Sequence, residues 1–203
     1  MSQVLQLKIT LEGIDPPIWR RFLIDDSINF KKLHKIIQII MGWEDYHLYN
    51  FQIDKITYIE ASQDSKNQFA VDAMWSGFKS GSEKKKYKDN EAIVSDFINK
   101  EKQKILYTYD FGDSWEHLIN VEKIFPKEAD KKYPLCIDGA RACPPEDCGG
   151  IWGYQELLEI LKDPRHPEYE ERIEEWLGGD FDPEEFNLEN INKKLKNIRY
   201  GRA

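Results

Sequence analysis

The sequence has no long apolar run, no signal-like start and few cysteines, and each shortage excludes a class of protein. Its longest apolar stretch, Ile36 to Ile40, is interrupted by Gln38, whereas a membrane-spanning helix needs about 20 apolar residues. Residues 2–11 alternate polar and apolar side chains and lack the continuous apolar core of a secretory signal. We therefore expect a cytoplasmic protein with no membrane-spanning segment.

Cysteine occurs three times, at Cys136, Cys143 and Cys148. An odd count in a chain without an export signal favours free thiols or metal ligands over a disulfide framework. A chain of 203 residues can bury a sizeable core without such cross-links. With 40% hydrophobic and 13% aromatic residues, the composition predicts one folded domain over residues 1–203.

Basic residues are also in deficit, since 29 of them oppose 37 acidic residues and the net charge is −8. The imbalance is concentrated in residues 156–189, which hold 13 acidic residues and three basic ones. Phosphate backbones repel such a surface, so we expect no nucleic-acid binding. An acidic stretch of this kind is usually a solvated face, although it would also suit a basic protein partner. The lysine-rich segment 84–88 lies beside glycines and serines and predicts a solvated loop within residues 76–88.

The apolar pattern predicts strands first and helices last. Residues 3–11, 18–24 and 46–53 have strand-like alternation, and a helix with apolar residues at helical spacing is expected from Phe30 to Met41. Asp25, Asp26 and Ser27 offer capping side chains before this helix, and Gly42 suits its end. A short strand at 69–71 and a helix at 91–98 are weaker predictions.

Residues 105–124 predict a β-hairpin. Two β-prone runs flank Gly112-Asp113, a pair suited to a two-residue turn. With that turn, Asp110 would face Trp115 and Thr108 would face His117, which places all four on one side and Asp110 diagonally from His117.

The C-terminal third predicts three helices, with a helical subregion from about 153 to 199. The first ends at Asp163-Pro164, the second at Gly178-Gly179, and Asn187 caps the third. The expected fold is therefore α+β: a mostly antiparallel, twisted sheet with one packed helix and a C-terminal helical layer.

Two groups of residues offer site chemistry. In the first, Cys136, Cys143 and Cys148 would supply thiolates to zinc, with His117 or His47 as the fourth ligand. The C-x₆-C-x₄-C spacing is wider than the usual zinc knuckle, so a proline- and glycine-rich loop with buried thiols is the competing interpretation. On balance we expect no cofactor, and zinc at these residues is the alternative that stays open.

In the second group, Asp110 or Asp113 would orient His117 or His47 for general base catalysis or for metal-assisted hydrolysis. A histidine beside aromatic residues on a strand is more often a hydrogen-bonded packing group. The tryptophans, too, serve burial more often than they line a groove.

Several segments together resemble the plasmid pRiA4b ORF-3-like family. They are Pro17-Ile18-Trp19-Arg20, Gly42-Trp43 with His47-Leu48, the run from Tyr109 to His117, the run from Arg141 to Gly150, Gly153-Tyr154, and Asp180-Phe181-Asp182-Pro183. The resemblance covers nearly the whole chain but implies little about activity. Some members carry a transposon resolvase label, yet the candidate serines here lie beside acids rather than within an arginine-rich site, so we expect no resolvase activity.

Two hypotheses remain open. The first is a non-enzymatic binding or adaptor module that uses the face around the Asp110 to His117 hairpin and the Cys136 to Tyr154 loop. The second is a metal-dependent hydrolase or nuclease at the same face. The sequence alone assigns neither a substrate nor an oligomeric state.

Overall fold

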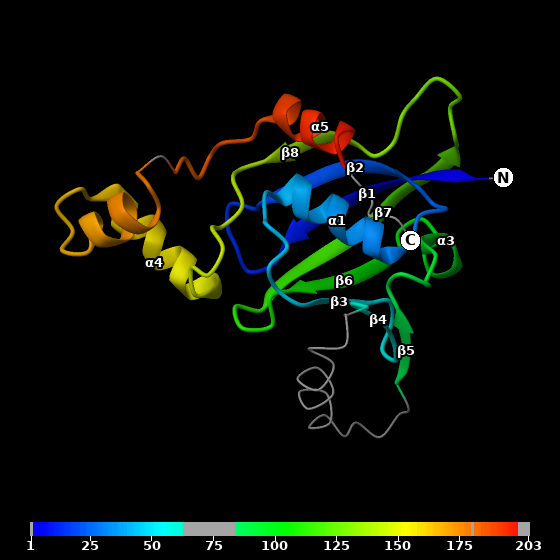
Figure 1. Cartoon of the computed structure of the whole chain (residues 1–203), viewed down its shortest axis with the longest axis horizontal. Coiled ribbons are helices and arrows are strands. Elements are labelled where there is room, and N and C mark those ends of the chain that lie inside the picture. Colours follow the sequence, from blue (N-terminus) through cyan, green and yellow to red (C-terminus); the bar gives the residue numbers. More distant parts are fainter. Residues whose placement is uncertain (1, 63–83, 180, 199–203) are drawn as a thin grey trace.

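A computed structural model describes residues 2–62, 84–179 and 181–198, and an eight-stranded sheet forms its centre (Figure 1). The strand order is β5-β4-β3-β6-β7-β1-β2-β8, and β4 with β5 is the parallel pair in an otherwise antiparallel sheet. The strands are β1 Gln3–Leu11, β2 Trp19–Asp25, β3 Tyr49–Gln52, β4 Thr57–Glu60, β5 Lys85–Lys88, β6 Lys104–Tyr109, β7 Trp115–Pro126 and β8 Leu135–Ala140. The helices are α1 Phe30–Met41, α3 Val94–Phe97, α4 Gly150–Lys162, η1 Glu170–Trp176 and α5 Leu188–Lys196. The predicted α+β class is confirmed.

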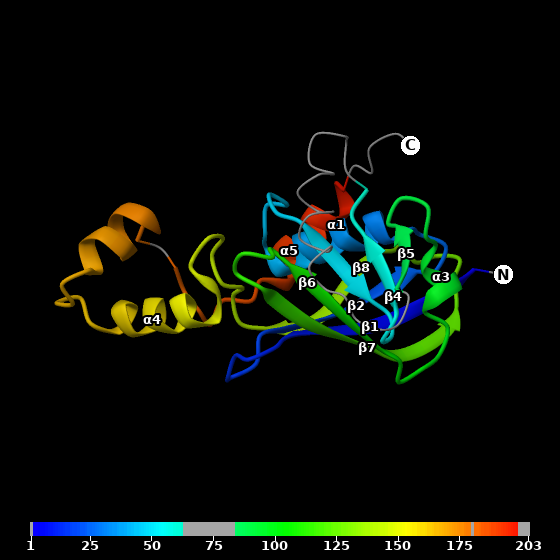
Figure 2. The same ribbon diagram turned by 90° about the horizontal axis from the view of Figure 1, so that it is seen from below.

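Helix α1 lies across one face of the sheet, as its amphipathic sequence predicts (Figure 2). Its N-cap is Asn29, whose side chain accepts a hydrogen bond from the Lys32 N–H at 3.0 Å, so the capping predicted at residues 25–27 is wrong. Asp25 and Ser27 instead bond each other before the helix begins. Gly42 ends the helix at φ 104°, a left-handed conformation that glycine adopts without strain and that confirms its predicted role.

The space between α1 and the sheet is filled by aromatic and aliphatic side chains. Trp115, Tyr107 and Tyr109 are fully buried there beside Phe30 and Phe51. Such large rings contribute most of the apolar area that a core removes from water. The polar atoms taken inside with them must then find partners within the protein.

Three short strands are absent from the sequence predictions. Strands β4 and β8 carry no clear alternation, and β5 lies where a loop was predicted, so that part of the prediction is wrong. Strand β5 is an exposed edge strand, and Lys86 pairs with Glu60 of β4 at 2.8 Å. Lysine on an edge strand prevents further strand pairing, which explains a basic sequence in a sheet. The strand predicted at residues 69–71 lies outside the described residues, as does Trp75.

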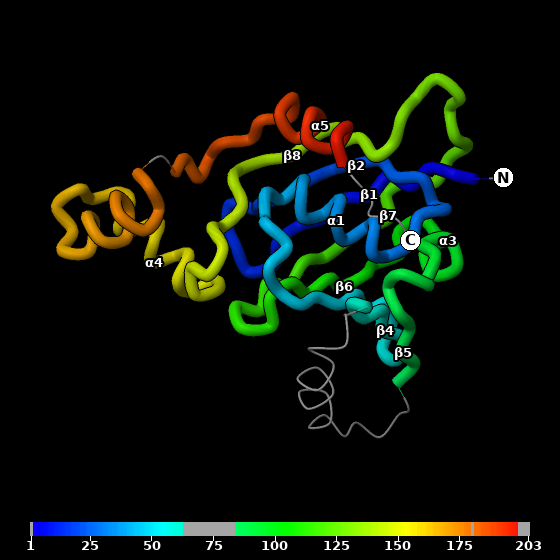
Figure 3. Tube along the Cα trace, viewed as in Figure 1, coloured from blue at the N-terminus to red at the C-terminus, as the bar shows by residue number. Residues whose placement is uncertain are grey.

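The three predicted C-terminal helices are present, but they occupy two places. Helix α5 lies beside β8 and α1 (Figure 3). Asn192 of α5 accepts a hydrogen bond from the Cys136 N–H at 2.9 Å and donates one to the Cys136 carbonyl at 2.8 Å. Helices α4 and η1 pack on each other and project from the body as an arm (Figures 1 and 2). We call residues 150–179 the arm from here on. None of the described helices combines the length and apolarity that crossing a membrane requires.

Candidate functional site

The β6–β7 connection is longer than the sequence predicts. Tyr109 pairs with Trp115 and Tyr107 with His117, so the predicted pairing of Asp110 with Trp115 and of Thr108 with His117 is wrong by one residue. Residues 110–114 form the connection, in which Asp110 Oδ1 accepts a hydrogen bond from the Gly112 N–H at 2.9 Å. Thr108 therefore faces away from His117, and Asp110 leaves the sheet instead of lying diagonally from it.

His117 is sealed in the core. It has no exposed surface, and its ring lies 5.1 Å from that of Trp43 and 5.4 Å from that of Tyr107, between centroids. Burial lowers its pKa to about 4, so the imidazole is neutral at physiological pH. Its Nδ1 lies 3.3 Å from the Tyr107 carbonyl oxygen, and Nε2 has no hydrogen-bond partner among the described residues. Packing is the role that this environment supports.

His47 lies in the loop between α1 and β3, among three carboxylates from two other loops. Its Nδ1 is 3.7 Å from Asp110 Oδ1, and its Nε2 is 3.2 Å from Asp147 Oδ1 and 3.9 Å from Glu146 Oε2. We call His47, Asp110, Glu146 and Asp147 the His47 cluster. One ligand atom each from His47, Asp110 and Asp147 can be chosen so that all three lie within 4.8 Å of one another. An imidazole with two carboxylates is a ligand set that divalent metals accept.

Only one oxygen of the Glu146 carboxylate is hydrogen-bonded to described residues. Its Oε1 accepts hydrogen bonds from the Tyr109 hydroxyl at 3.0 Å and from the Glu44 N–H at 2.9 Å. Burial, followed by the Glu146 charge, raises the pKa of Tyr109, which keeps the hydroxyl a donor. The other oxygen, Oε2, and the facing His47 Nε2 are buried without a hydrogen-bond partner among the described residues. Buried polar atoms left in this way are uncommon and call for an explanation such as an ion.

The cluster is partly open to solvent. The Asp147 side chain is 67% exposed, whereas those of Asp110 and Glu146 are 9% and 16% exposed. Such a gradient would leave one side of any ion held here facing water while the protein fixed the other.

Glu146 also lines a neighbouring cleft of about 510 Å³. The cleft lies between the end of α1, residues 142–146, and α5 with the segment that leads into it. Its apolar lining includes Ile39, Met41, Trp43, Pro144, Phe186 and Ile191. Ligand sites commonly combine an apolar wall with a few polar groups of this kind.

Asp113 anchors the arm instead of joining the cluster. Its Oδ2 accepts a hydrogen bond from the Gly149 N–H at 3.1 Å. A Cβ at Gly150 would lie 2.7 Å from the Asp113 carbonyl oxygen, so glycine is required where the two segments touch.

The cysteines are free and not reactive in this environment. Burial raises the pKa of Cys136 to about 11 and that of Cys148 to about 12, and it holds the pKa of Cys143 well above its usual value. Protonated thiols are poor nucleophiles. Within the parts of the chain that the structure describes, neither the cysteines nor His117 belong to a group of three or more potential ligands. Zinc at the cysteines therefore stays a prediction.

Two of the four cluster residues were predicted as site residues, His47 and Asp110, while Glu146 and Asp147 were missed. The feature that could have pointed to them is that they are adjacent acids in the Cys143 to Gly150 segment, a loop in which prolines and glycines impose turns. The contact of Asp147 with His47 spans 100 positions of the chain, and no local pattern predicts such a contact.

Comparisons with other proteins agree with the motifs found in the sequence. The family model of plasmid pRiA4b ORF-3-like proteins matches residues 3–190. The uncharacterized protein y4hQ of Sinorhizobium fredii (strain NBRC 101917 / NGR234) is 31% identical over 199 residues, which is 98% of this chain and 93% of that protein. A protein of unknown function from Methanosarcina mazei Go1, MM3350, has a solved structure similar to this one, with a TM-score of 0.78 and 39% identity over 94% of this chain and 98% of that one. The protein therefore belongs to the plasmid pRiA4b ORF-3-like family.

Proposed function

We propose that the protein is a non-enzymatic binding module that recognises its ligand through a divalent metal ion held by the His47 cluster. The observation that carries the proposal is the meeting of potential ligand atoms of His47, Asp110 and Asp147 within 4.8 Å of one another. These side chains come from three separate loops. His47 Nε2 and the neighbouring Glu146 Oε2 are both buried and lack hydrogen-bond partners among the described residues. A cation bound by these three side chains would satisfy His47 Nε2, a water on the cation could donate to Glu146 Oε2, and the positive charge would offset the carboxylates.

The chemistry of the ligand set narrows the choice of metal. Carboxylates suit Mg²⁺, Ca²⁺ and Mn²⁺, while an imidazole favours transition metals such as Zn²⁺. The combination in the His47 cluster suits Mn²⁺ or Zn²⁺ best. With three protein ligands the ion keeps open positions for water or for an oxygen of the recognised molecule.

The absence of an activated nucleophile among the described residues favours binding over catalysis. The thiols are protonated because they are buried, and His117 is sealed away from solvent. Covalent catalysis needs a thiolate, or a hydroxyl with an adjacent base.

A metal-dependent hydrolase is the second candidate, and the position of Glu146 favours it. Its free oxygen lies 3.9 Å from His47 Nε2 and its side chain lines the cleft. A carboxylate in that position could take a proton from a metal-bound water, which is the role of a general base in metal-assisted hydrolysis.

Metal titration tests the proposal. The full chain, stripped with a chelator, should bind one Mn²⁺ or Zn²⁺ in a calorimetric titration, and His47→Ala or Asp110→Asn should weaken the affinity by about tenfold or more. The matched control is His166→Ala, a histidine of the arm. If no metal binds, the proposal fails. If Zn²⁺ binds but is lost on Cys143→Ser instead, the thiols are the ligands and the His47 cluster is not the site.

Glu146→Gln separates the two candidates. A hydrolase should cleave generic phosphate or carboxylate esters in the presence of the metal, and this variant should keep the metal but lose the rate. A binding module should show no such turnover in either protein, whereas turnover that depends on Glu146 would overturn the non-enzymatic proposal.

A further inference from the structure

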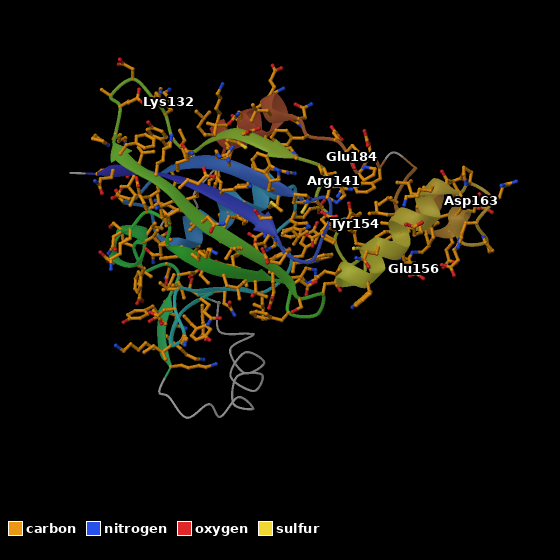
Figure 4. The ribbon with its side chains drawn as sticks, turned by 180° about the vertical axis from the view of Figure 1, so that it is seen from behind. Lys132, Arg141, Tyr154, Glu156, Asp163 and Glu184 are labelled. Atoms are coloured by element: carbon orange, nitrogen blue, oxygen red, sulfur yellow. The ribbon has the colours of Figure 1, made fainter. Side chains whose placement is uncertain are left out.

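The arm is folded around a small interior of its own. Tyr154, Leu157, Ile160 and Ile173 are buried between α4, η1 and the segment that returns to the body. Figure 4 shows Tyr154 at the junction, next to Arg141 and Glu184, with Asp163 at the far end of the arm. Arg141 closes the junction by donating to Glu184 at 2.8 Å and to the Pro16 carbonyl at 2.6 Å. The helices are therefore fixed to the body at one end while most of their surface faces solvent.

The exposed surface of the arm keeps a large apolar side chain in water. Trp152, near the start of α4, is 83% exposed, and Trp176, at the end of η1, is 44% exposed. Tryptophan is the residue type that most often supplies binding energy when it becomes buried in an interface. The arm's own interior is already complete without Trp152.

The arm also carries a charge that its own residues do not balance. Residues 150–179 contain eight acidic residues and three basic ones. Lys162 pairs with Glu159 at 2.7 Å, Arg165 lies 3.6 Å from Asp163, and the Arg172 guanidinium lies over the Trp176 ring at 5.7 Å. Six exposed carboxylates make no ion pair with any described residue, namely those of Glu156, Glu168, Glu170, Glu171, Glu174 and Glu175.

We propose that the arm is the docking surface for an arginine- or lysine-rich segment of a partner protein, with Trp152 as its anchor. Cations of the partner would pair with the free carboxylates, and a guanidinium or ammonium would also be attracted to the exposed indole face. Nucleic acid is repelled by this surface. A second copy of the chain would bring an arm of the same charge, so arm-to-arm pairing is opposed as well.

The first test measures binding of a fluorescent arginine-rich peptide to the full chain by anisotropy. The peptide should bind, and its affinity should fall as salt is added because exposed charges are screened. A peptide with glutamate in place of each arginine should not bind. In amide spectra of the isotope-labelled protein, the shifts caused by the peptide should lie within residues 150–179. Shifts elsewhere, or no binding, would overturn the proposal.

A matched pair of charge-reversal variants separates docking from general attraction to an acidic protein. The arm variant combines Glu170→Lys, Glu171→Lys and Glu174→Lys, and the body variant combines Glu12→Lys, Glu116→Lys and Asp130→Lys, all at exposed positions. Both change the net charge equally. The arm variant should weaken binding by about tenfold or more, whereas the body variant should change it by less than about threefold. Equal losses would overturn the proposal.

Trp152→Ala tests the anchor. The side chain is exposed, so the substitution should leave the circular dichroism spectrum and the melting temperature unchanged while it weakens peptide binding. Unchanged affinity would remove the anchor from the proposal. Sedimentation of the protein alone tests whether a second copy of the chain occupies the arm instead. If the protein self-associates and the arm variant does not, the arm pairs copies of this chain and the proposal fails.

Discussion

The core beneath α1 and the His47 cluster both bring a histidine close to a carboxylate, but the contacts are short and buried in the core and longer and partly solvated in the cluster. In the core, His34 Nε2 lies 2.6 Å from Asp45, Nδ1 lies 2.8 Å from the Tyr107 hydroxyl, and the ring stacks on Tyr49 at 3.4 Å. In the cluster, His47 lies 3.2–3.9 Å from its carboxylates and part of its surface faces solvent.

The difference separates polar groups whose hydrogen bonds stabilise the fold from polar groups that remain available to a ligand. Short contacts fix a buried polar group, whereas a buried acceptor without a donor costs stability until something binds it. His117 is a partial exception, since its Nε2 has no partner among the described residues although aromatic rings surround it. On this view, substitutions in the core should change stability and those in the cluster should change binding.

The largest expected effect is in the core. Trp115 is fully buried and its ring centroid lies 6.2 Å from that of Trp43. Trp115→Ala removes the indole from the layer between α1 and the sheet, and it should lower the free energy of unfolding by about 3–5 kcal/mol. Urea unfolding followed by circular dichroism measures this change. A loss below about 1 kcal/mol would mean that the layer is not packed as described.

The second effect is a pH dependence that originates from His117. The pKa of His117 is lowered by burial from 6.5 to about 4, so between these pH values the unfolded chain takes up a proton that the native protein does not. Stability should therefore fall as the pH is lowered from about 6.5 to 4 and become independent of this group below that range, with a total of about 3 kcal/mol. Unfolding curves of the wild type across this range should show the loss.

His117→Phe isolates that contribution. The variant has its own stability, so the comparison is between the slopes of unfolding free energy against pH and not between absolute values. Burial also lowers the pKa of His34, which therefore adds to the slope in both proteins. The slope should be smaller in the variant, and identical slopes would contradict the proposed state of His117.

The hairpin shows why the core was easier to predict than the cluster. Alternation and helical spacing predicted β1, β2, α1 and the two β-prone runs, because burial of one face requires such patterns. The register failed because Asp110, at φ 52°, holds the Gly112 N–H with its own carboxylate and lengthens the turn to five residues. A dipeptide rule for two-residue turns does not consider that interaction.

The cluster depends on chain positions that no local rule reaches. His47, Asp110 and Asp147 are brought together by the pairing of β3 with β6 and by the segment after β8, which reaches the β6–β7 connection where Gly149 donates to Asp113. Strands β4 and β5 have four residues each, too few for a clear period of two. The sequence could therefore supply candidate residues for the site but not choose among them.

The third effect concerns the segment that carries Asp147. Gly150 has φ 67°, and a Cβ there would lie 2.7 Å from a backbone oxygen of Asp113. Gly150→Ala should cost about 1–3 kcal/mol and should weaken metal binding as well, because Asp147 moves with the segment. Gly178→Ala is the matched control, since it has φ 81° and nothing within 4 Å of its Cβ. If both variants keep full metal affinity, the segment does not position the site.

The smallest effect on stability is expected at His47 itself. Its contacts are long and partly solvated, so His47→Ala should change the free energy of unfolding of the metal-free protein by less than about 1 kcal/mol. With the metal in hundredfold excess over its dissociation constant, the wild type should gain about 2.7 kcal/mol, because the ion binds only the folded chain. His47→Ala should lose about half of that gain or more, as a tenfold or greater loss of affinity implies, while His166→Ala keeps it. Thermal unfolding with and without Mn²⁺ or Zn²⁺ measures both quantities on the same samples. A large loss in the metal-free variant would place His47 with the stabilising groups of the core, and the contrast between the two regions would no longer hold.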